Sequence, residues 1–163
     1  MSDVSGGIYL VYKLIHIVAV VMFLGNITTG LFWHRHAAGT HDPRILAHTM
    51  AGIIRSDRIF TIPGVVLIIL AGVAAAMKGN FPIWRTDWIR WALILFSVSG
   101  FAFMARVAPL QRKLLATARA GASGGGFDEP AYHRLTRQWE FWGAIALLAP
   151  IVALVLMVLK PTN

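Results

Sequence analysis

Cysteine is absent from this sequence, which excludes disulfides, thiolate metal sites and the covalent attachment of a c-type haem. Charged residues are also scarce, at 13% of the chain, whereas 57% of its residues are hydrophobic. Ordinary soluble domains carry a charged fraction of about 25%. We therefore expect a polytopic membrane protein with no separate soluble domain.

Four apolar stretches occur along the 163 residues. The predicted spans cover about residues 8–33, 59–77, 88–108 and 139–159. The first span holds 26 residues, more than the roughly 20 that a helix needs to cross the hydrocarbon layer of a membrane. The predicted fold class is all-α: a bundle of four transmembrane helices, forming a single domain over residues 1–163, with helical extensions on the cytoplasmic side.

Acidic residues number only seven, against fifteen lysines and arginines, and the formal net charge is +8. In a soluble protein this excess would suggest nucleic acid as a partner, but here the basic residues fall between the spans, where they set orientation. The first and third loops hold ten of them and the opposite face holds five. We therefore expect no nucleic-acid partner, a place in a bacterial inner membrane, and both termini on its periplasmic side.

Turn and cap signals predict further helices between the spans. Asp42 followed by Pro43 is typical of a helix start, and the apolar stripe from Leu46 to Ile54 predicts an amphipathic helix at the membrane interface. The Pro63-Gly64 pair predicts a kink in the second span. The sequence GASGGG at residues 121–126 predicts a flexible cytoplasmic turn between two helices.

His16 lies inside the first span, where an ionisable side chain is costly and marks a candidate site. On a helical wheel it shares a face with Phe23, Gly30 and His34, so this face is predicted to point into the bundle. One interpretation makes His16 an axial ligand of haem iron, because imidazole is a usual haem ligand and a flat macrocycle suits a helix bundle. The other makes it a hydrogen-bonded histidine between two helices.

Three cations lie at a predicted depth that suits the propionates of such a haem: Lys13, Arg90 and Lys160. For each of them, orientation of the chain or snorkelling toward the membrane surface is an alternative. Together with Phe23 on the inward face, they complete a predicted cofactor-binding set around His16, with haem b as the cofactor and His16 as the ligand of its iron. The sequence predicts no catalytic residue.

The five remaining histidines all fall on the predicted cytoplasmic side: His34, His36, His41, His48 and His133. Because they show no tight ligand spacing such as H-x-x-x-H, we interpret them as solvated interface residues rather than as a metal site. A copper-handling role, which would use His34, His36 and His48, stays open as an alternative.

Two further groups of residues mark the predicted membrane boundaries. Five tryptophans lie near span ends and are expected to be interfacial anchors: Trp33, Trp84, Trp88, Trp139 and Trp142. Glu140 is an acid at the boundary of the fourth span, and we expect it to pair with Arg137 or Arg106. A proton-relay role for Glu140 would be the functional alternative.

Several short motifs resemble those of known membrane families. They are the opening YLVYKLIHIV, the Pro63-Gly64 pair, Trp88 at the start of the third span, and Lys160-Pro161 after the last apolar run. In these motifs the chain resembles HemJ-type protoporphyrinogen oxidases and CopD-like membrane proteins. It is also similar, over nearly its whole length, to a bacterial family of predicted integral membrane proteins of unknown function that is related to both. The resemblance to HemJ-type proteins implies b-type haem on His16.

The functional hypothesis is therefore a b-haem-binding inner-membrane protein that transfers electrons or oxidises a small lipophilic substrate such as a quinol or porphyrinogen, as a HemJ-like oxidoreductase would. Its expected partners are the lipid bilayer, a quinone or porphyrin-like molecule, and a second copy or another subunit of a membrane complex. An alternative from another class is a non-catalytic accessory or anchoring subunit, in which the hairpin around residues 121–126 docks a partner.

Overall fold

The computed structural model describes residues 2–160, and every regular element in this range is helical. In chain order the helices are α1 (Ser2–Ala38), α2 (Pro43–Ser56), α3 (Ile62–Lys78), α4 (Asp87–Ala102), α5 (Ala108–Ala122) and α6 (Glu129–Leu159). Two five-residue π-helical segments, Asp57–Thr61 and Phe103–Val107, join α2 to α3 and α4 to α5. The described chain thus forms four long helices.

All four helices are long and apolar enough to cross a membrane. They comprise 37 residues in α1, 36 in each of the two joined helices, and 31 in α6, whereas about 20 residues suffice to cross the hydrocarbon layer. Each predicted span lies within one of them. The prediction of an all-α, multi-pass integral membrane protein with four spans is therefore confirmed.

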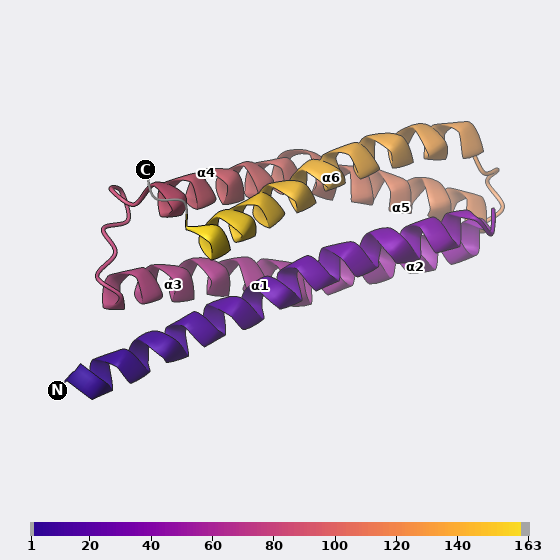
Figure 1. Cartoon of the computed structure of the whole chain (residues 1–163). Coiled ribbons are helices and arrows are strands. Elements are labelled where there is room, and N and C mark those ends of the chain that lie inside the picture. Colours follow the sequence, from indigo (N-terminus) through magenta and orange to yellow (C-terminus); the bar gives the residue numbers. More distant parts are fainter. Residues whose placement is uncertain (1, 161–163) are drawn as a thin grey trace.

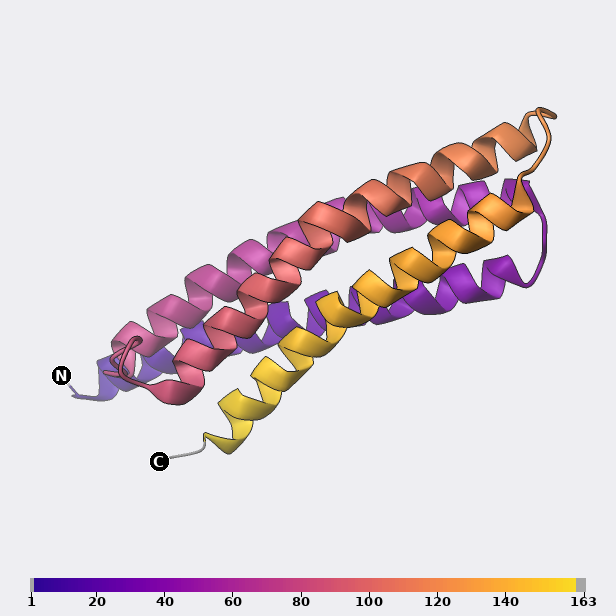
Figure 2. The same ribbon diagram turned by 90° about the horizontal axis from the view of Figure 1, so that it is seen from above.

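Successive helices run in opposite directions, so the connections fall at two ends of the bundle (Figures 1 and 2). We define the distal end by the connections at residues 39–42 and 123–128. The terminal end holds the two chain termini and the connection at residues 79–86. Helices α2 and α5 belong to the distal half of the bundle, and α3 and α4 to the terminal half.

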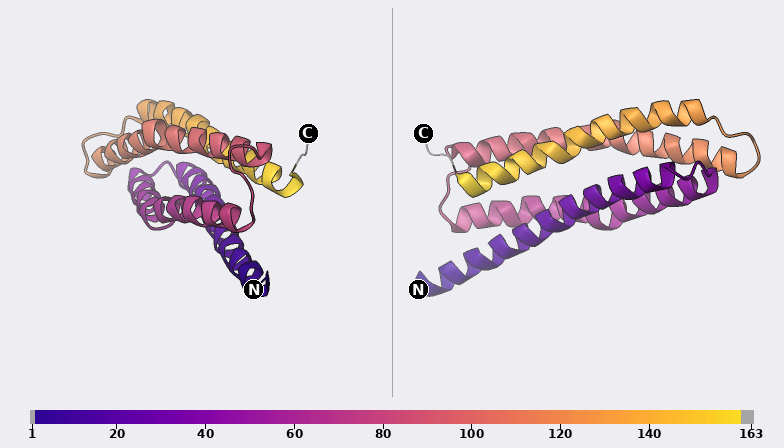
Figure 3. Two further views of the ribbon diagram at one scale, coloured as in Figure 1. Left: turned by 90° about the vertical axis from the view of Figure 1, so that its left-hand side faces the viewer. Right: turned by 45° about the vertical axis from the view of Figure 1, so that its right-hand side comes forward.

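The two halves of the bundle are packed differently. In the terminal half, α1 packs on α3 and α4 packs on α6, while the Cα atoms of α3 stay more than 8 Å from those of α4 and α6 (Figure 3). Phe23 of α1 and Phe96 of α4 bridge the two pairs, with ring centroids 5.7 Å apart. In the distal half, α2 packs on α5 and α5 on α6, around a larger apolar core that includes Met50, Leu114 and Tyr132.

Helix α2 begins where the sequence predicts, because the Asp42 side chain accepts a hydrogen bond from the backbone N–H of Arg44 at 2.8 Å. The prediction that its apolar stripe lies in the membrane interface is wrong. Leu46, Met50 and Ile53 are buried where α2 packs against α1 and α5. Since α2 also continues without a break into the second span, it is part of the bundle rather than a surface helix.

Each π-helical segment ends two residues before a proline, Pro63 or Pro109. Proline has no N–H to offer the carbonyl four residues earlier, and here the preceding N–H groups bond five residues back, from Ile62 to Asp57 and from Ala108 to Phe103. The predicted irregularity at Pro63-Gly64 therefore takes the form of a π-bulge, a feature that is frequent at functional sites. It turns Asp57 and Thr61 inward, and both are buried.

The predicted glycine-rich turn is shorter than its sequence suggests, because α5 extends to Ala122. Gly121 is part of that last helical turn, and a Cβ atom at this position would lie 2.8 Å from Phe127 and 2.9 Å from Pro43. Only glycine leaves room there. This close approach brings the 123–128 connection against the start of α2 at the distal end.

Candidate functional site

A buried carboxylate occupies the middle of the bundle. Asp57 is 7% exposed, and its Oδ1 accepts hydrogen bonds from Asn26 Nδ2 at 3.0 Å and from Thr61 Oγ1 at 2.8 Å. Its Oδ2 accepts one from Gln111 Nε2 at 2.8 Å. These partners are all neutral, so hydrogen bonds alone compensate the burial of a carboxylate that would be costly if unpaired.

Three helical segments bring this network together. Asn26 comes from α1, Asp57 and Thr61 from the first π-helical segment, and Gln111 from α5. Asn26 Nδ2 also lies 2.9 Å from Thr61 Oγ1, so the amide serves two acceptors. The network therefore connects α1 to both joined helices at the level where the terminal and distal halves meet.

A narrow pocket, partly open to the surface, borders this network, and the space inside it that a water molecule can enter is about 20 Å³. Four lining residues carry polar atoms: Asn26, Asp57, Gln111 and Trp139. The others are apolar or glycine: Ile27, Gly30, Leu31, Ile53, Phe103, Val107, Gly143 and Ala146. Apolar walls with a few convergent polar groups are typical of sites for small molecules.

Trp139 is buried beside this pocket, with 3% exposure, so the prediction that it is an interfacial anchor is wrong. Its ring packs on His34, with centroids 4.7 Å apart. His34 is fully buried and its Nε2 lies 3.0 Å from the Tyr132 hydroxyl. The indole Nε1 of Trp139 and Nδ1 of His34 are buried without a hydrogen-bond partner among residues 2–160. Such orphaned groups call for an explanation, for example a bound molecule.

His16 is half-buried and faces α3, as its helical wheel predicts. Its Nδ1–H donates to the Ile68 carbonyl at 2.9 Å, and the ring is so close to α3 that a Cβ atom at Gly72 would lie 2.9 Å from Nδ1. This is the interhelical hydrogen bond of one interpretation. It also leaves Nε2 unbonded within the described part of the chain, which is how a histidine that ligates metal is usually oriented.

The other residues of the predicted cofactor-binding set do not gather around His16. Lys13 lies near Tyr9 on its own helix, with Nζ 5.9 Å from the ring centroid, and Phe23 is buried against α3 and Phe96. Arg90 pairs with Asp87 at 2.8 Å.

Lys160 lies over the rings of Phe81 and Trp88, at 5.8 and 5.6 Å from their centroids. Arg90 and Lys160 thus lie on the α4 side of the bundle, whereas His16 and Lys13 belong to α1. The Cα atoms of α1 and α4 stay more than 8 Å apart, so Lys13 and Phe23 lie on the same helix as His16, whereas Arg90 and Lys160 do not.

Polar contacts at the distal end also differ from those expected. Glu140 pairs with Arg35 of α1 at 2.9 Å, not with Arg137 or Arg106, because α1 packs along α6 there. The guanidinium of Arg106 instead lies 5.3 Å from the Trp142 ring centroid. The histidines of the copper alternative are separated: His34 is buried, whereas His36 and His48 are exposed on α1 and α2.

Sequence reasoning missed Asp57 and Gln111, which fall just outside the predicted spans. Each nevertheless continues a buried helical stripe. Asp57 follows Leu46, Met50 and Ile53 at spacings of four, three and four residues, and Gln111 lies within the set Val107, Leu110, Leu114 and Ala118. The sequence signal that could have found both residues is therefore a polar residue at a position where the helical spacing of the apolar stripe predicts a buried side chain.

The comparisons with known proteins agree with this architecture at the level of the family. A family model described as "Predicted integral membrane protein (DUF2269)" matches residues 10–161. No curated protein and no solved structure matches the chain.

Proposed function

As a member of the DUF2269 family of predicted integral membrane proteins, this chain crosses a lipid bilayer several times, and we propose that it binds a small lipid-soluble molecule of the quinone class in the pocket beside Asp57. One observation supports this proposal above all. A buried carboxylate, held by donors from α1 and α5, lies in the wall of a largely apolar pocket. Ionisable groups in such positions commonly mark substrate or proton pathways in membrane proteins.

The chemistry of the pocket suits both redox forms of a quinone. The hydroxyl groups of a quinol would donate to the Asp57 carboxylate, and a quinone carbonyl would accept from the unpartnered Nε1–H of Trp139. The flat ring and the tail of the molecule would enter from the open side of the pocket and move its apolar side chains apart, because the existing space holds only about one water molecule. Quinol binding at this position is a hydrogen-bonding step in which the Asp57 carboxylate is the acceptor, and no oxidation is assigned to the chain.

The depth of Asp57 also suits proton exchange. Asp57 precedes Lys78, the last residue of α3, by 21 residues, or about 32 Å of helix. This is close to the hydrocarbon thickness of about 30 Å. With Lys78 at one membrane surface, Asp57 lies near the other, where the head group of a quinone meets water and a released proton can leave.

The test measures the binding of a short-chain quinone, decylubiquinone, to the full chain in detergent. Calorimetry or tryptophan fluorescence reports the binding. We expect saturable binding. Gly30→Leu should abolish it, because the leucine side chain would fill the pocket. Asp57→Asn should weaken binding of the quinol more than binding of the quinone. The matched controls are Gly25→Leu, at a glycine with open space around it, and Asp87→Asn, at the exposed acid of the terminal end. Equal affinity in Gly30→Leu and the original chain would overturn the proposal.

A second candidate function, electron transfer by a b-type haem on His16, draws on the resemblance to HemJ-type proteins and on one contact. The bond from His16 Nδ1 to the Ile68 carbonyl fixes the ring with Nε2 available, so His16 would hold the iron and Lys13 is the cation on the same helix. Haem would supply one-electron chemistry.

This second candidate is tested by the visible spectrum of the chain purified after expression with a haem precursor. We expect a Soret band that His16→Ala removes and that the control variant His36→Ala, at an exposed histidine of the same helix, retains. A colourless original chain would contradict haem binding, and a haem spectrum that His16→Ala leaves unchanged would contradict His16 as the ligand. Both results would leave the quinone proposal untouched.

A further inference from the structure

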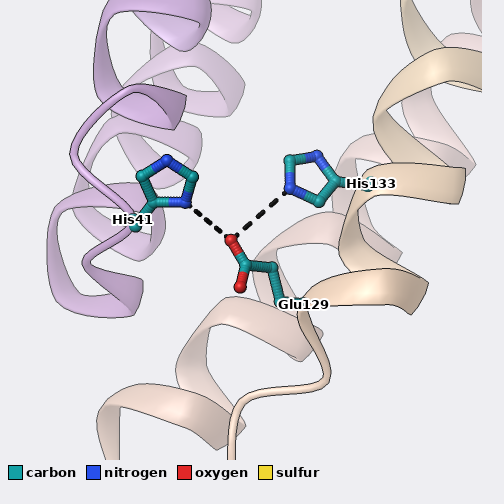
Figure 4. Close-up of side chains that lie close together, drawn as sticks. All are labelled: His41, Glu129 and His133. Atoms are coloured by element: carbon teal, nitrogen blue, oxygen red, sulfur yellow. Dashed lines mark hydrogen bonds and ion pairs between the residues drawn. The ribbon is translucent and has the colours of Figure 1, made fainter.

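Three side chains with metal-ligand atoms converge at the distal end, away from the Asp57 pocket. They are His41, in the connection between α1 and α2, and Glu129 and His133, in the first turns of α6 (Figure 4). One ligand atom from each lies within 4.8 Å of the other two. In the described range this is the one group of three such residues that converges in this way.

Local structure positions each of the three. His41 has a left-handed backbone, with φ of 54°, which histidine adopts more readily than most residues. Asp128 caps α6 by accepting from the Ala131 N–H at 2.9 Å, so Glu129 is the first residue of that helix. His133 follows Glu129 by four residues and therefore lies on the same helix face.

Both histidines point at one carboxylate oxygen. His41 Nδ1 lies 2.6 Å and His133 Nε2 lies 3.5 Å from Glu129 Oε1, and Figure 4 shows the carboxylate between the two rings. All three side chains are partly exposed, with side-chain exposures of 68%, 44% and 50% for His41, Glu129 and His133. An ion from solution can therefore reach them without opening the bundle.

We propose that these three residues bind one divalent transition-metal ion of the Zn²⁺ class. Two imidazole nitrogens and one carboxylate oxygen are a ligand set that zinc takes in sites with an open fourth position. The same residues border a second, shallow pocket, whose wall includes Tyr132 and Phe127. The open position of the metal would face this space, which has room for about one water molecule.

Bound metal would join the α1–α2 connection to α6. Two other polar contacts already link α1 to α6 in this half of the bundle, His34 to Tyr132 and Arg35 to Glu140. At the very end, His41 and Glu129 already make a third contact, which a shared metal ion would replace with bonds to all three side chains, so its binding stabilises the distal half by linkage. This inference does not depend on the proposed quinone pocket, whose residues are different.

The experiment uses the full chain in detergent, purified through an affinity tag without histidine, and Zn²⁺ alone as the probe. We expect one equivalent of Zn²⁺ to bind saturably and to raise the midpoint of thermal unfolding. Loss of a ligand in His133→Ala or Glu129→Gln should weaken binding by more than the roughly 10- to 100-fold that loss of an outer partner costs. His48→Ala, at an exposed histidine of α2, is the matched control.

Two further measurements keep the test decisive. His41→Asn, which tolerates the left-handed backbone, should weaken binding as His133→Ala does. Co²⁺ bound to the original chain should show the visible d–d bands of a four-coordinate site, and Glu129→Gln should remove them. Absence of saturable Zn²⁺ binding, or binding that is equal in the original chain and in His133→Ala, would overturn the proposal and leave a simple histidine–glutamate ion pair.

Discussion

The Tyr132 hydroxyl lies 3.0 Å from Nε2 of His34, inside the bundle and shielded from solvent. This bond joins α6 to α1, two helices that are far apart in the sequence. It belongs to the buried core of the distal half, where Trp139 also packs against the same imidazole. The bond therefore helps to set how α1 and α6 pack together.

The variant Tyr132→Phe should destabilise the protein. It removes one partner and leaves His34 Nε2 buried and unpaired, which costs about 1–3 kcal/mol in the free energy of unfolding. Thermal unfolding in detergent, followed by circular dichroism, measures the loss. Tyr12→Phe is the control, since Tyr12 is half-exposed in α1; an equal effect of both variants would count against a special role of the His34 bond.

Removal of Gln111 tests the carboxylate network separately from ligand binding. In Gln111→Met, Oδ2 of Asp57 loses the hydrogen bond that it receives at 2.8 Å. A buried carboxylate with a missing donor costs about 1.5–3 kcal/mol, so we expect a lower unfolding midpoint. Asp57→Asn in the same background should restore part of the loss, and Gln138→Met, on the exposed face of α6, should have no measurable effect.

Gly72 determines how closely α1 approaches α3. A Cβ atom in Gly72→Ala would lie 2.9 Å from His16 Nδ1, so the imidazole must move and its bond to Ile68 is broken. We expect destabilisation, although glycine to alanine within a helix normally stabilises by up to about 1 kcal/mol. Gly52→Ala, at a position with open space, should show that normal stabilisation. If both variants gained stability, the close contact between His16 and α3 would be disproved.

The distribution of basic residues predicts which way the bundle faces, and the absence of cysteine makes this easy to measure. Ser123→Cys at the distal end and Thr86→Cys at the terminal end each introduce a unique thiol. In intact bacterial cells, a membrane-impermeant maleimide should label Cys at position 86 and spare position 123. The reverse labelling would show that the termini face the cytoplasm.

Hydrophobic periodicity and cap signals were sufficient to predict the four spans, the helix start at Asp42 and the inward face of His16. These features are local, because an apolar run of about 20 residues or a helix cap can be recognised in the sequence without knowing which segments pack against it. The interfacial position of the α2 stripe was wrong because an amphipathic helix looks the same in sequence whether its apolar side meets lipid or, as here, α5.

The other features that the sequence did not predict depend on contacts between segments that are distant in the chain. Glu140 meets Arg35 across 105 residues, and the cluster of His41, Glu129 and His133 combines a loop with a helix that begins 88 residues later. No spacing rule for a single helix contains such pairs. Asp57 was missed for a different reason. The predicted second span begins two residues after Asp57, although the buried stripe of α2 continues through Asp57.

The helices are much longer than the bilayer is thick. At 1.5 Å per residue, helices of 31 to 37 residues measure about 46–56 Å, against a hydrocarbon layer of about 30 Å. With Lys78 at one membrane surface, as proposed above, the surplus falls in the distal half, which would project beyond the lipid as a stalk with its own apolar core. Water drives the assembly of that stalk, whereas helices in lipid associate through close packing and polar contacts. Urea, which acts through the aqueous phase, should therefore loosen α2 and α5 while α3 and α4 remain folded.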